Sequence, residues 1–363
     1  MDTFTQGLLG AVIGQALFRV RLGRAAIIWG FIGGVLPDFD LLAGVVAGPV
    51  AGSIIHRGPT HSLPFAVLVA PVLGYISWRW QRHRARVGRQ QVARDKGPGG
   101  EGQWPFWALL WLLVLVGHDL LSWATSYGTL LLWPFSMQRF ALDAMPIVEP
   151  IYTLLLALAL VPGLRRDIRR PLAQIVAAAT LAVTTGYVLM GWHLNAKAVA
   201  VASQQMAADG VAAEDVRAYP TNFQLYLRRV IARRGAEIRV GFLSLWRAHP
   251  IAWQNFEQTE HPAQEALATT REGKTLRWVT RDQVYTRLGR HEDQGGVRLT
   301  AEIGDLRFGV PGPPDRGAVG WRAGFSEDGE MLSPPRYFRR RAPLNLDAIR
   351  WSVPMAFRPD AGD

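Results

Sequence analysis

The stretch Leu172–Trp192, LAQIVAAATLAVTTGYVLMGW, decides the fold class because its 21 residues carry no formal charge. A bilayer core of about 30 Å requires about 20 apolar residues in one helix, so this stretch predicts a membrane-spanning helix. Ser62–Trp78 and Leu120–Gln138 are further charge-free runs of 17 and 19 residues. Three such runs are unusual in a soluble domain, and together they indicate an integral membrane protein.

Four shorter apolar runs fill much of the remaining first half. Each has 12 to 14 residues, which is short of a full span, so we expect tilted, re-entrant or buried segments there. They are Gly7–Phe18, Ala25–Pro37, Trp104–Gly117 and Pro150–Gly163.

The charged residues divide the chain into two chemically different parts. Of the 69 charges (40 Lys or Arg and 29 Asp or Glu), residues 1–192 hold 25 and residues 193–363 hold 44, and there is no Cys. This composition excludes a disordered chain and a disulfide scaffold. We expect a mainly α protein with a polytopic membrane domain of about four to six helices over 1–192. A helical linker over 193–235 and a small β-rich domain over 236–363 should follow.

Three basic clusters lie between apolar segments, where short cytoplasmic loops are expected. With two crossings between successive clusters and one after the last, the chain beyond Trp192 is predicted to be extracytoplasmic in a multi-pass inner membrane protein. Apart from Trp80, the second cluster has no interleaved tryptophan, tyrosine or phenylalanine, which favours anionic lipid over nucleic acid as its partner. Asp2 stands where a signal peptide would be basic, so no cleaved leader is expected. The clusters are Arg19, Arg21 and Arg24; Arg79, Arg82, Arg84, Arg86, Arg89, Arg94 and Lys96; and Arg165, Arg166, Arg169 and Arg170.

The second half alternates short apolar and polar runs between Gly, Asp and Pro, which predicts strands. Helical character is expected at Ala196–Met206 and Phe223–Arg234. The predicted strands are Ile238–Leu245, Leu276–Thr280, Gln283–Leu288, Val297–Ile303 and Leu306–Val310.

Ionisable residues inside the apolar half are the strongest indication of a site, because insertion of each costs about 2.5 to 3.5 kcal/mol. They form three groups, and the predicted topology places each group near the extracytoplasmic end of its helix. Their three imidazoles and three carboxylates are ligands typical of zinc or another divalent metal, or of a metal pair. The groups are Asp38 and Asp40; His56, Arg57, Thr60, His61 and Ser62; and His118 and Asp119.

Each group also has a structural interpretation. Asp38 and Asp40 after Pro37 are typical of a turn that ends a helix. His56 and His61 are compatible with interfacial side chains, Ser62 with an N-cap, and His118 and Asp119 with a buried hydrogen-bonded pair. Three separate costly insertions at one face would need three such explanations, which favours a shared site.

Five parts of the chain carry recognisable sequence blocks: GVLPDFD at 34–40, HRGPTHS at 56–62, SYGT at 126–129 with WPFS at 133–136, IVEP at 147–150 and DLRFG at 305–309. These blocks resemble those of the predicted membrane-bound, metal-dependent hydrolases of bacteria, a family that includes inner-membrane members under SOS control. The resemblance implies a multi-helix membrane domain with metal ligands at Asp38, Asp40, His56 and His61. It also implies distant similarity to the helical zinc-dependent phospholipases C, and hence a lipid phosphoester substrate.

Two positions depart from the family pattern. The family places Asp four residues after the histidine of the fourth helix, where this chain has Ser122 after His118 and carries its carboxylate at Asp119. Glu149 stands where the family block has Asp, which keeps the charge and adds one methylene.

These observations predict an integral membrane hydrolase whose divalent metal, zinc as first choice, activates water against a lipid-like or phosphoester substrate at the extracytoplasmic face. Asp119 or Glu149 would act as general base or support the ligands, and Arg57 would bind a substrate phosphate. The alternative is a non-enzymatic membrane protein, either an ion-coupled transporter or a scaffold. A transporter typically has midplane polar residues and a repeated half, and neither is evident here. The predicted metal ligands are Asp38, Asp40, His56, His61 and His118.

Overall fold

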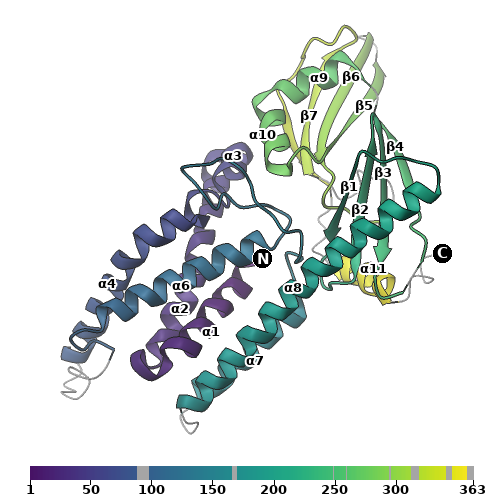
Figure 1. The fold of residues 1–363 in the computed structure, drawn as a ribbon. Coiled ribbons are helices and arrows are strands. Elements are labelled where there is room, and N and C mark those ends of the chain that lie inside the picture. The colour runs from purple at the N-terminus through teal and green to yellow at the C-terminus, as the bar shows by residue number, and fades with distance from the viewer. Residues whose placement is uncertain are drawn as a thin grey trace. The chain divides into compact units, whose positions relative to one another are not determined.

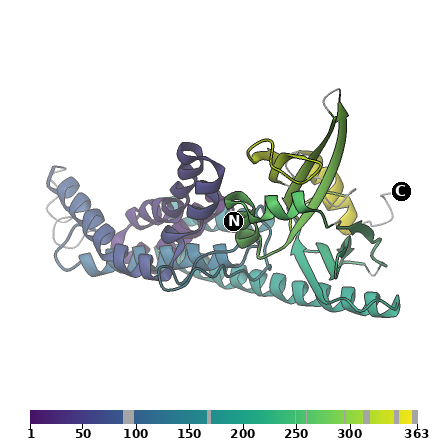
Figure 2. The ribbon, with the colours of Figure 1, turned by 90° about the horizontal axis from the view of Figure 1, so that it is seen from above.

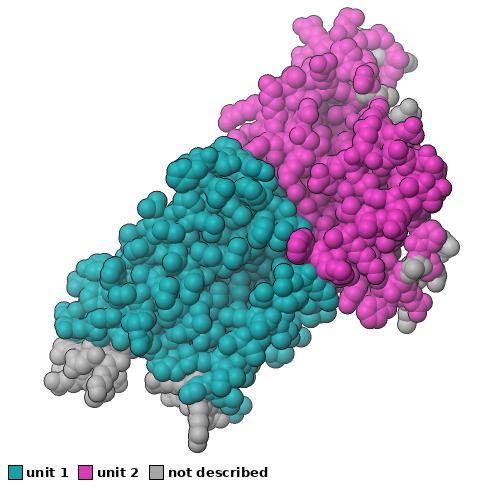
Figure 3. Space-filling model, viewed as in Figure 1, with its two compact units in different colours: residues 1–46, 55–142, 147–190 teal, residues 47–54, 143–146, 191–363 magenta. Residues whose placement is uncertain are grey.

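The computed structural model divides the chain into two compact units (Figures 1 and 3). Unit 1 comprises Met1–Val46, Ile55–Leu142 and Ile147–Met190, and unit 2 comprises Ala47–Ile54, Asp143–Pro146 and Gly191–Asp363. The residues described are 1–87, 98–165, 170–247, 249–258, 260–293, 296–311, 319–340 and 346–357. Parts of the second and third basic clusters, including Arg89, Arg94, Lys96, Arg166 and Arg169, lie outside these ranges.

The predicted fold class is confirmed, because the chain is mostly helical in its first half and ends in two small antiparallel sheets (Figure 1). Four stretches of the described residues are long and apolar enough to cross a membrane: Ala25–His61, Leu63–Arg86, Trp104–Trp123 and Pro171–Ala208. The helices are α1 (Thr3–Leu22), α2 (Ala25–Val35), η1 (Leu36–Leu41), α3 (Leu42–Ile55), η2 (Pro59–His61), α4 (Leu63–Val87), α6 (Trp104–Trp123), α7 (Pro150–Leu164) and α8 (Arg170–Ala208).

The first two helices pack with their backbones in contact. Gly10 and Gly14 of α1 face Gly30 and Ala26 of α2, and a Cβ added at Gly10 or Gly30 would collide with the carbonyl oxygen of the other. Small residues four apart permit this close approach between membrane helices, where packing rather than the hydrophobic effect drives association.

Another close pair in unit 1 is formed by α4 and α6. Ala66 and Ala70 of α4 pack against Trp111 and Leu115 of α6, and the Trp111 indole donates to Ser77 Oγ at 2.8 Å. The outer faces keep large apolar side chains exposed, which suits contact with lipid tails. Examples are Leu68, Val72, Leu109, Ile175 and Val183.

Two of the apolar runs are interrupted. Leu120–Gln138 is not a span, because α6 ends at Trp123 and the run continues into a loop held by an isolated bridge between Thr129 and Phe140. The stretch from Ala25 to His61 is not one straight helix either. Pro37 stands at the start of η1, and α3 is kinked at Gly48, whose φ of 85° only glycine adopts readily.

Unit 2 contains two four-stranded antiparallel sheets, ordered β1-β2-β3-β4 and β5-β6-β7-β8. On the second sheet, Ala263 and Leu267 of helix α9 pack against Leu299, Ala301 and Phe325. The strands are β1 (Asp215–Pro220), β2 (Leu227–Arg234), β3 (Glu237–Ser244), β4 (Gln254–Glu257), β5 (Val284–Asp293), β6 (Gly296–Asp305), β7 (Val319–Ser326) and β8 (Arg336–Arg339). The helices are α9 (Pro262–Thr269), α10 (Arg271–Thr280) and α11 (Leu346–Phe357).

Some secondary-structure predictions for this half are wrong. Leu276–Thr280 belongs to helix α10, and Leu306–Val310 is not a strand. The helix predicted at Phe223–Arg234, and with it the second part of the predicted helical linker, is largely strand β2.

The arginines of β2 explain this error. Their spacing resembles the exposed face of a helix, yet Arg228 and Arg229 are fully buried. Arg228 donates to the carbonyl oxygens of Ala144 and Gly191, at 3.2 and 2.9 Å, and Arg229 donates to Leu306 O at 2.8 Å. Burial lowers the pKa of Arg229 to about 10.

Helix α8 is one long helix of 39 residues (Figure 2). Within unit 2, Ala198 and Ala202 of its C-terminal part pack against Val230, Leu243 and Ile251. The end of α8 is therefore fixed to the first sheet by a shared core.

The contact between α1 and α2 generates a stability prediction. We expect Gly30→Ala to destabilise the protein by about 1–3 kcal/mol, because the added methyl group meets the backbone of α1. Thermal unfolding in detergent measures the effect. Gly186→Ala on α8 is the matched control, because a Cβ there has no neighbour within 4 Å. Equal melting temperatures for the two variants would contradict the packing described here.

Candidate metal centre

Three buried side chains from distant parts of unit 1 come together at one end of its helices. Asp38 lies in η1, His61 ends η2, and His118 lies in the last turns of α6. Each offers one ligand atom, and these atoms lie within 4.8 Å of one another. Asp38 Oδ1 is 3.3 Å from His61 Nε2 and 3.7 Å from His118 Nε2. One carboxylate and two imidazoles therefore surround a common point.

The ring of His118 is oriented by a backbone carbonyl. Its Nδ1 lies 2.8 Å from Gly34 O, which can only accept, so Nδ1 carries the hydrogen. The lone pair of Nε2 then faces Asp38, and among the described residues Nε2 has no hydrogen-bond partner. This arrangement is typical of a histidine that binds a metal through one ring nitrogen and is held through the other.

The ring of His61 is oriented in the same way by a carboxylate. Its Nδ1 lies 3.1 Å from Asp40 Oδ2, and its Nε2 points toward Asp38. A carboxylate that accepts from the outer nitrogen fixes the tautomer and makes the inner nitrogen a better metal ligand. Asp40 thus contacts the three-residue group through the outer ring nitrogen of His61 and is not itself one of the three.

Asp40 also fixes the loop that carries His61. Its Oδ1 lies 2.8 Å from His56 Nδ1, and its Oδ2 accepts from the backbone N–H of Arg57 at 2.9 Å and from Thr60 Oγ1 at 3.1 Å. The residues that flank the two ends of α3 are therefore hydrogen-bonded to each other. Burial of this carboxylate is offset by four hydrogen-bonding partners.

Short 3-10 turns produce this geometry locally. Each has a proline in its first turn, Pro37 in η1 and Pro59 in η2. In η1 the two aspartates are buried, whereas Phe39 between them is exposed. Arg57 has a positive φ of 55°, which turns the chain between His56 and Pro59.

Asp119 is the least compensated carboxylate of the described residues. It is 1% exposed, and neither of its oxygens has a hydrogen-bond partner there. Burying such a group without a partner costs several kcal/mol. Asp119 lies close enough to His61 for a charge interaction, so a cation held by the three-residue group would offset part of this cost.

The remaining predicted site residues lie around the three-residue group and have other contacts. His56 is hydrogen-bonded to Asp40 and packs at a tilt against Tyr127, with ring centroids 5.0 Å apart. Arg57 donates through Nη1 to Ser122 O at 3.2 Å and to Thr125 Oγ1. Glu149 is fully buried at the N-terminus of α7, where it accepts from Ile151 N at 3.3 Å. Their predicted roles as ligand, phosphate contact and base stay predictions.

Three supporting residues were not singled out from the sequence. Gly34 offers the carbonyl that orients His118, and Gln6 donates to His118 O at 3.3 Å and to Ser122 Oγ at 3.0 Å. Arg139 donates to His56 O at 3.1 Å. Gln6 is a lone polar residue before an apolar run, and this position is a sequence signal for a buried polar contact. The role of Gly34 has no such signal, because it is played by a backbone carbonyl.

The donor set fits a divalent cation. Catalytic zinc sites commonly use three protein ligands and keep a fourth position for water or substrate. Asp38, His61 and His118 provide three ligands, and Asp38 Oδ2 and His118 Nε2 are buried atoms without another hydrogen-bond partner in the described chain. A mixed imidazole and carboxylate set suits zinc and also other divalent metals.

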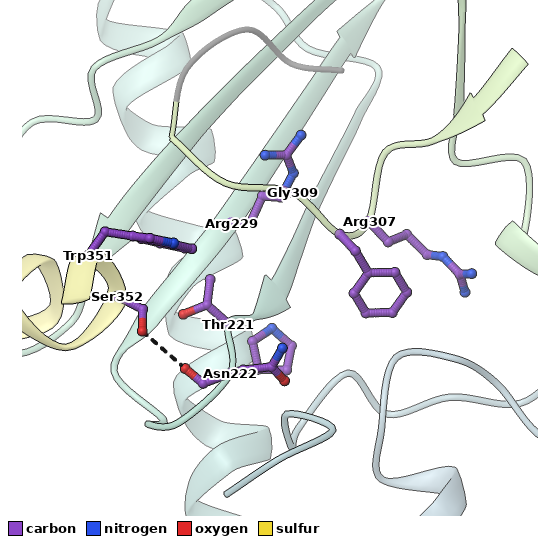
Figure 4. Close-up of a pocket in the computed structure, with 9 residues that line it drawn as sticks. Thr221, Asn222, Arg229, Arg307, Gly309, Trp351 and Ser352 are labelled. Carbon is purple, nitrogen blue, oxygen red and sulfur yellow. Dashed lines mark hydrogen bonds between the residues drawn. The ribbon is translucent and has the colours of Figure 1, made fainter. Parts of the chain in front are cut away.

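The DLRFG block of unit 2 lines a separate small pocket of about 20 Å³ (Figure 4). Arg307 is bonded to Asp305 at 2.8 Å, and Gly309 leaves room for the guanidinium of Arg229. A volume of this size holds about one water molecule. The block is therefore explained by packing around buried arginines.

Comparisons with known proteins identify a family of inner membrane proteins. The family described as YdjM inner membrane protein matches residues 1–196, which include all residues of the candidate metal centre. The inner membrane protein YbcI of Escherichia coli (strain K12) is 34% identical over 137 residues, which are 36% of this chain and 64% of that protein. The chain thus spans slightly less than two thirds of this relative's length. No solved structure matches.

The bonds of Asp40 predict a local change on mutation. In Asp40→Ala, we expect faster amide hydrogen exchange over residues 41–61, because the two ends of α3 lose their common acceptor. Hydrogen–deuterium exchange read by mass spectrometry measures this. The control is Asp209→Ala, which removes an exposed carboxylate at the end of α8. Unchanged protection of 41–61 in Asp40→Ala would show that Asp40 does not hold the loop.

Proposed function

The chain belongs to the YdjM inner membrane protein family, and we propose that it is a membrane hydrolase dependent on a divalent cation bound by Asp38, His61 and His118. The observation that carries the proposal is the pair of histidine rings, each held through Nδ1 so that both Nε2 atoms face Asp38. Histidines that only fill a protein core do not require their Nε2 atoms to face the same carboxylate. Zinc is the first choice of cation.

A divalent cation in such a site polarises the scissile bond and lowers the pKa of a bound water toward 7. Asp38 and the two imidazoles would hold it, while Asp40 keeps His61 in the required tautomer. Asp119 is proposed as the general base, because both of its oxygens are available to accept a proton. Glu149, which already caps α7, is proposed to support the site rather than to transfer protons.

The proposed substrate is a lipid phosphoester. Phe39, Leu41 and Leu42 are exposed beside the aspartates of η1, and Phe135 is exposed in the loop after α6. Apolar side chains at this end of the unit would contact the acyl part of a substrate while the polar group reaches the cation. Arg57 is a weaker candidate for the phosphate contact, because its Nη1 already donates to two protein acceptors.

Metal content is the first test. We expect His61→Ala and His118→Ala, purified in detergent, to retain less than about a tenth of the wild-type metal, because each removes one of three ligands. Elemental analysis by mass spectrometry measures the stoichiometry. His193→Ala on α8 is the control, because it removes an exposed histidine outside the group. Wild-type metal content in both site variants would remove this group as the cation site.

The same preparations test the hydrolase. Wild-type protein should cleave a phosphodiester or lipid phosphoester substrate, and Asp119→Asn should keep its metal but lose about 10²- to 10⁴-fold in rate. If Asp119→Asn also loses the metal, Asp119 is a ligand and not the base. A metal-loaded wild-type protein that cleaves none of a panel of phospholipids, phosphoesters and esters would favour a non-enzymatic metal protein.

We also propose that unit 2 is extracytoplasmic. The basic clusters at Arg19, Arg79 and Arg165 support cytoplasmic loops, which leaves one crossing, the apolar part of α8, before unit 2. Reporter fusions after Lys96 and after Gly210 should therefore signal opposite sides of the membrane. Two reporters active on the same side would overturn this orientation.

A further inference from the structure

A second feature with ligand character lies in unit 2, where the end of α8 meets the chain after β3. A cavity of about 420 Å³ opens there, lined by side chains that include Lys197, Val201, Leu245, Trp246, Arg247 and His249. Of the lining residues that the structure describes, none is acidic. The cavity therefore offers two exposed cations above an apolar floor.

The sequence of α8 fixes the depth of this cavity relative to a membrane. The charge-free run ends at Trp192, and Lys197 follows five residues later, about 7.5 Å further along a helix. This distance places Lys197 in the headgroup layer of the bilayer that the preceding residues cross. The exposed Trp192 is a typical marker of the same interface.

The rest of the cavity is held at that depth by its contacts with α8. Ala198 and Ala202 share a core with Leu243 and Ile251. Gln205 bonds Ile251 in both directions, accepting from its N–H at 2.8 Å and donating to its carbonyl oxygen at 3.1 Å. The segment that carries Trp246 and Arg247 thus cannot move far from the helix.

The aromatic wall of the cavity is also preorganised. Trp246 is 55% exposed although it packs edge-on against Tyr226 and Phe357, with ring centroids 5.0 and 5.4 Å apart. An exposed tryptophan fixed in this way at headgroup depth suits the boundary between polar and apolar parts of a lipid.

We propose that this cavity binds the phosphate of an anionic phospholipid headgroup. Lys197 and Arg247 provide the charge for the phosphate, and Val201 and Leu245 contact the glycerol and the start of the acyl chains. The site is independent of the candidate metal centre, and it would anchor the first sheet to the membrane surface.

Site-directed photocrosslinking tests this binding. Full-length protein with p-benzoylphenylalanine in place of the exposed His249 is reconstituted in nanodiscs of mixed phosphatidylglycerol and phosphatidylcholine. Irradiation should give adducts at position 249 mainly with phosphatidylglycerol. Lys197→Gln combined with Arg247→Gln should lower their yield on the order of tenfold.

The control combines Arg271→Gln with Lys274→Gln, which removes one arginine and one lysine from an exposed part of α10. It should leave the adduct yield unchanged, and melting temperatures should confirm that both double variants fold. The proposal is overturned if Lys197→Gln with Arg247→Gln keeps the wild-type yield, or if phosphatidylcholine adducts are equally frequent. Suppression of the adducts by excess inorganic phosphate would reveal a site for soluble anions and would overturn it as well.

Discussion

The carboxylate of Asp40 is the constraint on which the rest of the site depends. It accepts from the backbone of Arg57 and contacts ring nitrogens of His56 and His61, and it thereby closes the chain around α3. Because a buried carboxylate without partners is costly, these contacts must form together. The Asp40 oxygen that accepts from the backbone after α3 also lies at Nδ1 of His61 and sets the tautomer of that ring. The contact that closes the chain around α3 therefore also orients His61.

The helices supply the second requirement, which is proximity. Glycines let α1 and α2 approach closely, and Gly34 at the end of α2 offers its carbonyl to His118 of α6. Helix packing thus positions His118, whereas the hydrogen bonds of Asp40 hold the turn that carries His61. A preorganised set of ligands of this kind needs little rearrangement to bind a cation.

Much of this organisation was predictable from the sequence. Apolar run lengths predicted the membrane part, and the cost of inserting charge predicted that Asp38, Asp40, His56, His61 and His118 belong to one site. The sequence could not show which of the five form the close group, because that depends on which ring nitrogen faces which oxygen. Strand β2 was missed because its arginines are satisfied by distant carbonyls, which no local pattern reveals.

X-ray absorption at the metal edge of the purified, metal-loaded protein shows directly whether Asp38, His61 and His118 bind the cation. We expect a first shell of nitrogen and oxygen at about 2.0–2.2 Å for zinc, with outer-shell scattering from two imidazoles. The scattering should fall to one imidazole in a weakly loaded His118→Ala sample. A metal surrounded only by oxygen, or a spectrum that this substitution leaves unchanged, would contradict the assignment of His61 and His118 as ligands.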